Sequence, residues 1–170
     1  MIVFMEIVDK LNNKRQYLNK TAERRENTLG EYRQSAHTWI INSEGKFLMQ
    51  KRSPNKRTFP NMWSITGGAV DSGETPLQGA LRECKEELGI DIPKSNIELI
   101  LSFKRKYDFV DIWLVKLDIA LNDLVLQTEE VASAKWCTID EIRDMQKNGE
   151  LAPSIDIYLD MFINLLNYEF

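Results

Sequence analysis

Residues 68–90 read GAVDSGETPLQGALRECKEELGI and contain the best-marked helix of the chain. Thr75 is a candidate N-cap, Pro76 would occupy the first helical position, and Gln78 completes a capping box. Gly89 supplies a stop signal. Apolar side chains recur at spacings of four, three and four residues and predict one buried stripe, formed by Leu77, Leu81, Cys84 and Leu88.

Three glutamates lie opposite this stripe, and we call Glu83, Glu86 and Glu87 the helix glutamates. At about 100° per residue they fall within one patch of the helix surface. Like charges at these spacings cost only about 0.2–0.5 kcal/mol per pair when exposed. Arg82 and Lys85 soften the repulsion further. Taken alone, the three residues therefore favour a solvated, charged helix face.

The residues before the helix shift this interpretation towards a metal site. Gly67 and Gly68 end an apolar strand, and a loop leads from them to Glu74. A glycine can turn its backbone carbonyl towards a ligand without interference from a Cβ atom. Mg²⁺ prefers an octahedron of oxygens that carboxylates, a carbonyl, water and substrate phosphate can supply. The loop and the helix together could offer those oxygens.

The spacing resembles the Nudix box, which is Gly, five residues, Glu, seven residues, and then Arg-Glu-apolar-any-Glu-Glu-any-Gly-apolar. Seven positions of the box demand one residue type, and all seven match: Gly68, Glu74, Arg82, Glu83, Glu86, Glu87 and Gly89. Chance agreement is on the order of 10⁻⁸ per start site at average residue usage. Cys84 stands where the family usually has an aliphatic residue, and a cysteine packs as a small hydrophobe.

The resemblance implies a fold and an activity. It implies a Nudix α/β/α sandwich and a hydrolase that cleaves a diphosphate linkage in a nucleoside diphosphate derivative or nucleotide. Mg²⁺ or Mn²⁺ would offset the substrate's charge and activate water. The chain has a net charge of −4 and would by itself repel an anionic substrate, but the metal ion would supply the positive charge that attracts it. The roles implied are metal binding by Gly68, Glu83, Glu86 and Glu87, orientation of this group by Arg82, and support from Glu74 behind the ligands or through a metal-bound water. One of the helix glutamates or a loop glutamate would help to deprotonate the attacking water.

The wider pattern predicts an α+β fold, because strands and helices mix without regular βαβ alternation. We expect one domain over residues 1–170, with a hairpin and linker at 1–34, a core at 35–150 and a C-terminal helix at 151–170. The strands expected are two around an Asn12–Asn13 turn, a hairpin over 35–53, two near 97–107 and 111–121, and one at Trp136. A helix should run from the Thr138 capping box to about 148. A last helix should begin at Pro153 and carry one apolar face, formed by Ile155, Tyr158, Leu159, Phe162 and Leu166.

Four further residues are candidates for substrate binding. Lys51 and Arg52 could reach a phosphate, and Trp63 could stack on a base. Glu130, next to Glu129, could bring a further carboxylate from a distant loop. Each has an ordinary alternative: a solvated lysine or arginine, a core tryptophan, or a plain acidic loop. His37 lies on an apolar strand, where a lone histidine is more often structural.

Two other functions remain open. Residues 17–20 and 35–68 resemble the branch related to isopentenyl-diphosphate isomerase. That enzyme uses a cysteine in the loop after the tryptophan, together with histidine metal ligands, whereas residues 63–68 contain neither. The intact box also favours hydrolysis over isomerisation. The remaining alternative is a non-catalytic, nucleotide-binding Nudix domain, although such domains typically lose box glutamates.

Composition limits the class of protein. A net charge of −4 gives no general reason to bind nucleic acid or an acidic membrane surface. The two cysteines form no CxxC pair. The apolar stretch Met1–Met5 is not expected to be a signal peptide, because it is only five residues long, lacks a basic region and is followed at once by Glu6. No apolar run is long enough to span a membrane. We therefore expect a cytoplasmic protein with a small-molecule diphosphate as its partner. Residues 1–34 and the last helix are candidate surfaces for a homodimer.

Overall fold

The computed structural model describes residues 6–169, so Met1–Met5 and the expectation made for them lie outside the described residues. The N-terminal hairpin comprises β1 (Ile7–Leu11) and β2 (Tyr17–Glu23), as predicted. A second sheet holds the remaining strands: β3 (Arg33–Ile41), β4 (Phe47–Arg52), β5 (Trp63–Ser64), β6 (Thr66–Ala69), β7 (Ile97–Lys104), β8 (Asp108–Lys116) and β9 (Val131–Cys137).

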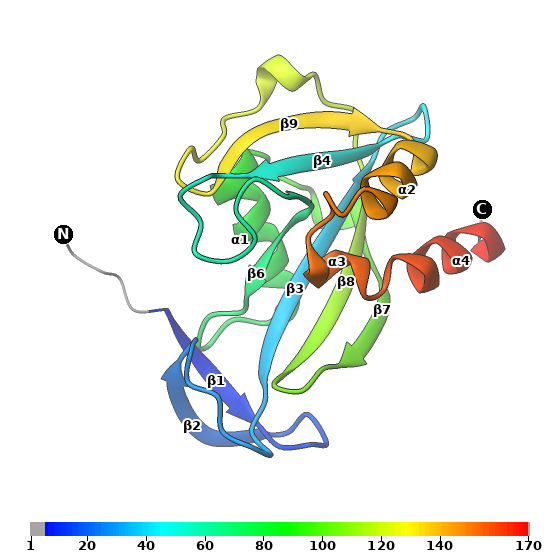
Figure 1. The fold of residues 1–170 in the computed structure, drawn as a ribbon. Helices are drawn as coiled ribbons and strands as arrows, with labels where there is room; N and C mark the ends of the chain where they lie inside the picture. Colours follow the sequence, from blue (N-terminus) through cyan, green and yellow to red (C-terminus); the bar gives the residue numbers. More distant parts are fainter. Residues whose placement is uncertain (1–5, 170) are drawn as a thin grey trace.

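Strand β3 organises this second sheet. It runs parallel to β8 and antiparallel to β6, and β7 adds to the far side of β8 in antiparallel orientation. After the turn at residues 42–46, β4 pairs with β3 only at Ile41 and Phe47 and then runs beside β9 and β5. The two hairpin strands thus diverge into two layers that cross (Figure 1).

Helices lie on both sides of the strands (Figure 1). The helix α1 (Pro76–Leu88) contacts β6 and β3 on one side, and α2 (Ile139–Lys147), α3 (Pro153–Asp156) and α4 (Leu159–Glu169) lie on the other. Two short 3₁₀ helices, η1 (Lys94–Asn96) and η2 (Leu121–Asp123), sit in connections. The predicted α+β sandwich, with a mixed sheet between helices, is confirmed.

The core has one large cluster towards α2 and α4 and two smaller clusters on the face that α1 covers. Towards α2 and α4, the rings of Trp39 and Phe162 stack at 4.4 Å between centroids, and Phe47 meets Trp39 edge-on. Towards α1, Ala36 packs with Ala80 and Val70. His37 lies in the core, where its Nδ1 is 3.0 Å from the Tyr158 hydroxyl.

Two predicted elements differ from the structure. The last helix is not continuous but breaks between α3 and α4, where Tyr158 turns its hydroxyl into the core towards His37. The predicted apolar face itself is confirmed, because its members pack in the core as expected. The strand predicted to reach residue 121 ends at Lys116, because Lys116 pairs with Ile41, the last residue of the neighbouring strand β3.

The N-terminal hairpin joins the larger sheet at two points. The backbones of Leu11 and Tyr32 exchange hydrogen bonds of 2.7 and 2.9 Å. At the hairpin turn, Arg15 pairs with the carboxylate of Asp111, whose side chain is only 3% exposed. No helix among the described residues is long and apolar enough to cross a membrane.

Candidate active site

The start of α1 is fixed by the predicted capping box. The Thr75 backbone N–H donates to Gln78 Oε1 at 2.8 Å, and Gln78 N–H returns a bond to Thr75 Oγ1 at 3.3 Å. The helix ends at Gly89, whose φ of 72° suits a residue without a Cβ atom. These caps set which way each side chain of the helix points.

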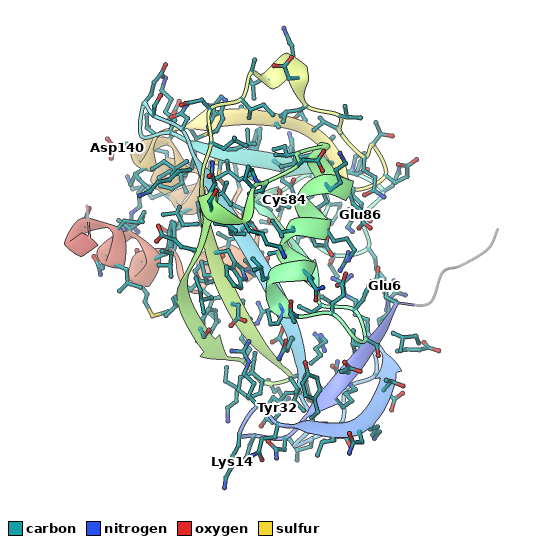
Figure 2. All side chains as sticks on the ribbon, turned by 180° about the vertical axis from the view of Figure 1, so that it is seen from behind. Glu6, Lys14, Tyr32, Cys84, Glu86 and Asp140 are labelled. Atoms are coloured by element: carbon teal, nitrogen blue, oxygen red, sulfur yellow. The ribbon has the colours of Figure 1, made fainter. Side chains whose placement is uncertain are left out.

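The helix glutamates do not form a uniformly solvated face. Glu87 is only 4% exposed and the Glu83 side chain 13%, whereas the Glu86 side chain is 51% exposed. Figure 2 labels Glu86 and the buried Cys84 on different sides of α1. Strand β6 comes close because residue 68 is glycine: a Cβ atom there would lie 2.3 Å from Glu83 Oε1. The solvated-face interpretation is therefore wrong for Glu83 and Glu87.

Arg82 links the loop before α1 to the helix glutamates. Its Nε donates to Glu74 Oε1 at 3.0 Å, and its Nη1 donates to Glu83 Oε1 and Glu86 Oε2, both at 3.0 Å. Its Nη2 donates to the Ala69 carbonyl at 3.0 Å. One guanidinium thus fixes three carboxylates relative to β6.

Glu87 faces the opposite wall of the site. Its Oε2 accepts hydrogen bonds from Gln50 Nε2 on β4 at 2.9 Å and from Gly67 N–H on β6 at 3.3 Å. Burial, and then the negative charge of Glu83, raises the pKa of Glu87 to about 8. Burial also raises the pKa of Glu83, although the Arg82 guanidinium opposes this rise.

Among residues 6–167, whose side chains the structure describes, no three histidine, cysteine, aspartate or glutamate side chains are already grouped as ligands around one point. Hydrogen bonds occupy one oxygen of each helix glutamate, namely Glu83 Oε1, Glu86 Oε2 and Glu87 Oε2. The second oxygen of each accepts no hydrogen bond from the described part of the chain. The site therefore retains hard oxygen donors, including the buried carboxylate of Glu87 and the largely buried one of Glu83, which suits Mg²⁺ or Mn²⁺.

A basic loop after β4 approaches the same site. Lys56 forms an ion pair with Glu130, and its positive charge acts on Glu87. The Glu130 segment is docked there because Ser53 N–H donates to the Glu130 carbonyl at 2.9 Å and Gln127 N–H donates to the Glu87 carbonyl at 3.1 Å. The predicted substrate residue Glu130 thus lies close to the carboxyl end of α1.

Arg52 lies on the α1 side of β4, because it alternates in step with Gln50. Its guanidinium donates to the Thr58 carbonyl at 3.0 and 2.9 Å and so holds the basic loop. Burial lowers the pKa of Arg52, and the carboxylate of Glu87 opposes this shift.

Lys51 and Trp63 point away from the helix glutamates. Met49 packs in the core on the α2 and α4 side, and Lys51 shares that side because strand residues alternate. Two lysine ammonium groups lie over the Trp63 ring, with Lys135 Nζ at 4.4 Å and Lys51 Nζ at 5.8 Å from its centre. The structure therefore separates these two candidates from Arg52 and Glu130.

Sequence reasoning missed Gln50 and Lys56. Gln50 is a buried polar residue in an otherwise apolar strand segment, and that contrast is a signal that could have marked it. Lys56 lies in an irregular loop without periodicity, and its neighbour Glu130 is 74 residues away in the chain. No local pattern in the sequence connects them.

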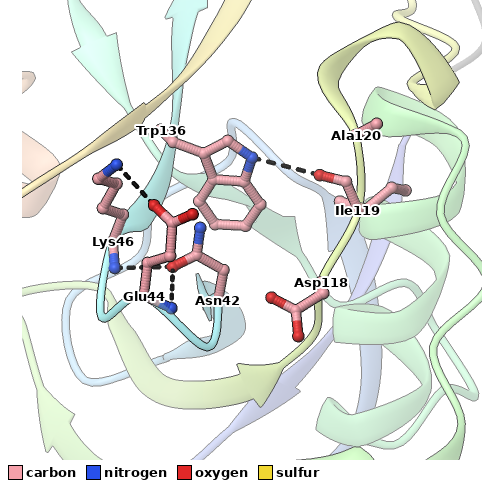
Figure 3. Close-up of a pocket in the computed structure, with 7 residues that line it drawn as sticks. All are labelled: Asn42, Glu44, Lys46, Asp118, Ile119, Ala120 and Trp136. Carbon is pink, nitrogen blue, oxygen red and sulfur yellow. Dashed lines mark hydrogen bonds and ion pairs between the residues drawn. The ribbon is translucent and has the colours of Figure 1, made fainter.

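A pocket of about 370 Å³ lies elsewhere, beside the β3–β4 turn (Figure 3). Asn42, Asp118 and Trp136 are among its lining residues, and Trp136 Nε1 donates to the Ile119 carbonyl at 3.3 Å. Along β3 this turn is about 16 Å from His37, which pairs with Gly67, at about 3.3 Å per strand residue. The pocket is therefore distinct from the site of the helix glutamates.

The sequence matches the family model of the NUDIX domain over residues 31–156. A Nudix hydrolase of Listeria innocua is 38% identical over 165 residues, which cover 96% of each chain. The Arabidopsis thaliana Nudix hydrolase 3 is 33% identical over 129 residues, or 68% of this chain and 17% of that protein.

Solved structures show the same fold. The protein DR0079 from Deinococcus radiodurans has a TM-score of 0.79 at 22% identity and covers 92% of this chain and 98% of its own. The MutT protein from Methanosarcina mazei has a TM-score of 0.61 at 26% identity, covering 78% of this chain and 94% of its own. The match over residues 31–156, the full-length likeness to the Listeria protein and the assembled box place this chain in the Nudix hydrolase family.

Proposed function

We propose that this chain is a metal-dependent hydrolase of a diphosphate linkage in a nucleoside diphosphate derivative or nucleotide. The observation that carries the proposal is the contact network around Arg82, which joins Glu74, Glu83 and Glu86 beside the buried Glu87. An exposed, ordinary acidic helix would not bury two carboxylates against a glycine strand, because unpaired buried charge is costly.

In this proposal the helix glutamates, with the Gly68 carbonyl, hold Mg²⁺ or Mn²⁺. When bound, the ion would offset the negative charge of the diphosphate and lower the pKa of a coordinated water. Arg82 keeps Glu83 and Glu86 in place, and Glu74 anchors Arg82 from the loop side. One of the helix glutamates, or Glu130, accepts the proton of the attacking water.

Arg52 and Lys56 are the proposed contacts for the substrate phosphates, because both lie on the α1 side of the site and bring positive charge towards Glu87. Lys56 would exchange its partner Glu130 for a phosphate when substrate arrives. Trp63 and Lys51 remain predictions from the sequence, and their place on the other side of β4 favours packing over a role in binding.

The structure supports hydrolysis over isomerisation. Cys84 and Cys137 are both fully buried, and burial raises the pKa of Cys84 to about 12, so neither offers an accessible thiol. The likeness of residues 17–20 and 35–68 to the isomerase branch stays a prediction. The non-catalytic alternative is less favoured, because every glutamate of the box is present and in contact with its partners.

The test is a release assay with purified protein. Nucleoside diphosphates, nucleoside triphosphates, nucleotide sugars and dinucleoside polyphosphates are each incubated with Mg²⁺, Mn²⁺ or EDTA, and the products are separated by chromatography. We expect metal-dependent cleavage at a diphosphate linkage by the wild type, and loss of at least 10²-fold in Glu87→Gln. The exposed Glu98→Gln on β7 is the matched control and should retain activity.

Three other results of this assay would contradict the proposal. Saturable nucleotide binding without cleavage of any compound would replace the proposal by a non-catalytic domain. Conversion of isopentenyl diphosphate to dimethylallyl diphosphate would replace it by an isomerase. Equal activity of Glu87→Gln and wild type would remove Glu87 from the mechanism.

A further inference from the structure

Strand β1 of the N-terminal hairpin holds the loop that precedes α1, and we call residues 71–74 the box loop. Ser72 Oγ donates to Asp9 Oδ1 at 2.7 Å, and Gly73 N–H donates to Asp9 Oδ2 at 3.0 Å. Ser72 N–H also donates to the Ile7 carbonyl at 2.8 Å. Both oxygens of one carboxylate, and a carbonyl of the same strand, thus fix two successive loop residues.

The box loop leads directly into the active-site contacts. Glu74 N–H donates to the Asp71 carbonyl at 3.0 Å, and Asp71 N–H donates to Glu74 Oε2 at 3.1 Å. Gly73 turns the chain between them with a φ of 83°. Glu74 then accepts the Arg82 guanidinium. A continuous series of contacts runs from Asp9 through the box loop and Arg82 to Glu83 and Glu86.

The hairpin is itself braced, so it can hold another element in place. Arg15 at its turn pairs with the buried Asp111 of β8. The ammonium of Lys10, which is 1% exposed, donates to the Glu26 carbonyl in the segment after β2. Asp9 directly precedes Lys10 on β1 and is only partly exposed. Its carboxylate is therefore presented to the box loop from a fixed strand.

We propose that Asp9 is a positioning residue for the active site. It holds the box loop so that Glu74 and Arg82 keep the metal-binding carboxylates in their positions. This inference rests on the proposed metal-dependent function. Asp9 lies outside residues 31–156, the part of the chain that matches the family model, so the hairpin adds a support that the matched domain alone does not contain.

The test compares Asp9→Ala with a control, Lys20→Gln, on the other strand of the same hairpin. The control removes the ion pair between Lys20 and Glu31 and does not change any contact of the box loop. Three quantities are measured on the full chain: amide exchange of a peptide covering the box loop, the Kd for Mn²⁺ without nucleotide by electron paramagnetic resonance, and kcat and KM on the best substrate of the panel. We expect Asp9→Ala to speed Gly73 amide exchange at least tenfold and to raise the Mn²⁺ Kd about tenfold, as loss of supporting contacts around a metal site does.

In the same variant we expect kcat to fall about tenfold while KM changes less than twofold, because positioning acts on the reacting geometry more than on substrate binding. Asp9→Asn keeps one acceptor oxygen and should give an intermediate Mn²⁺ Kd. Lys20→Gln should match the wild type in all three measurements.

Faster exchange in Asp9→Ala with an unchanged Mn²⁺ Kd and unchanged kcat would overturn the inference, because the loop would then be free without consequence. If Asp9→Ala does not fold, Ser72→Ala removes one of the same hydrogen bonds from the loop side, and a wild-type Mn²⁺ Kd in that variant would overturn it equally. A wild type that binds Mn²⁺ but cleaves no compound would refute the proposed hydrolysis, while the Mn²⁺ Kd would still decide the role of Asp9.

Discussion

The Arg82 guanidinium uses three nitrogens to hold Glu74, Glu83, Glu86 and the Ala69 carbonyl. A lysine ammonium is a compact point charge and cannot reproduce this planar fork. We therefore expect Arg82→Lys to lower kcat/KM about 10²-fold and to cost about 2 kcal/mol of unfolding free energy, as loss of charged hydrogen bonds does. Activity assays and urea unfolding measure these effects. Arg143→Lys, at the ion pair with the exposed Asp160, is the matched control, and an equal loss in both variants would contradict the expectation.

Glu87 illustrates a conflict between stability and function at a single residue. Its carboxylate is buried against Gln50 and Gly67, beside the negative charge of Glu83. Because the pKa of Glu87 is raised to about 8, folding near neutral pH must either protonate this group or bury its charge. A glutamine of the same shape avoids both costs, so Glu87→Gln should stabilise the protein in EDTA by at least about 1 kcal/mol. Mg²⁺ should raise the thermal unfolding midpoint of the wild type but not that of the variant. A variant that is less stable than wild type in EDTA would show that the charge is already well compensated.

At the scale of elements, the approach of β6 to α1 depends on one glycine. A Cβ atom at residue 68 would lie 2.3 Å from Glu83 Oε1, so Gly68→Ala must push the Glu83 side chain or the strand aside. We expect at least a 10²-fold loss of kcat/KM with the far-ultraviolet circular dichroism unchanged. Gly79→Ala on α1 is the control, because its Cβ would come no nearer than 3.1 Å to the Val70 side chain, which a shift of a few tenths of an ångström relieves, and 3.5 Å to Glu74 Oε2, which is ordinary contact, and alanine favours the helix. Full activity of Gly68→Ala would show that this close approach is not needed.

The sequence predicts where helices and strands begin and end better than it predicts which of their faces pack against one another. The caps at Thr75 and Gly89 are local signals, and the structure reproduces them. The burial of Glu87 is not local, since it depends on Gln50, which lies 37 residues away on a strand that diverges from β3 after the turn. A helical wheel shows three carboxylates on one side of α1, but it cannot show that β4 and β6 close over two of them.

At the scale of the whole molecule, the matched family region and the N-terminal hairpin act together. The family match over residues 31–156 accounts for the sandwich and the box, and both were expected from the motif and its spacing. The hairpin was predicted as two strands, but its contact through Asp9 with the box loop was not, because the partners are 63 and 64 residues apart. Long-range pairing of this kind carries no periodic signal, so it emerges only when the chain is folded.

The burial of His37 on β3, beside Tyr158 between α3 and α4, makes global stability depend on pH. Burial lowers the pKa of His37 from 6.5 to about 3, so the folded protein keeps this imidazole neutral while the unfolded chain protonates it below about pH 6.5. The unfolded state then binds the extra proton, and stability must fall as the pH drops from 6.5 towards 3. His37→Asn retains a polar atom near the Nδ1 position and does not titrate. Between pH 7 and pH 5, we expect urea unfolding to show a loss for the wild type that exceeds the loss for His37→Asn by about 2 kcal/mol. Parallel pH profiles of the two proteins would mean that His37 is protonated in the folded state and that the core around Tyr158 admits its charge.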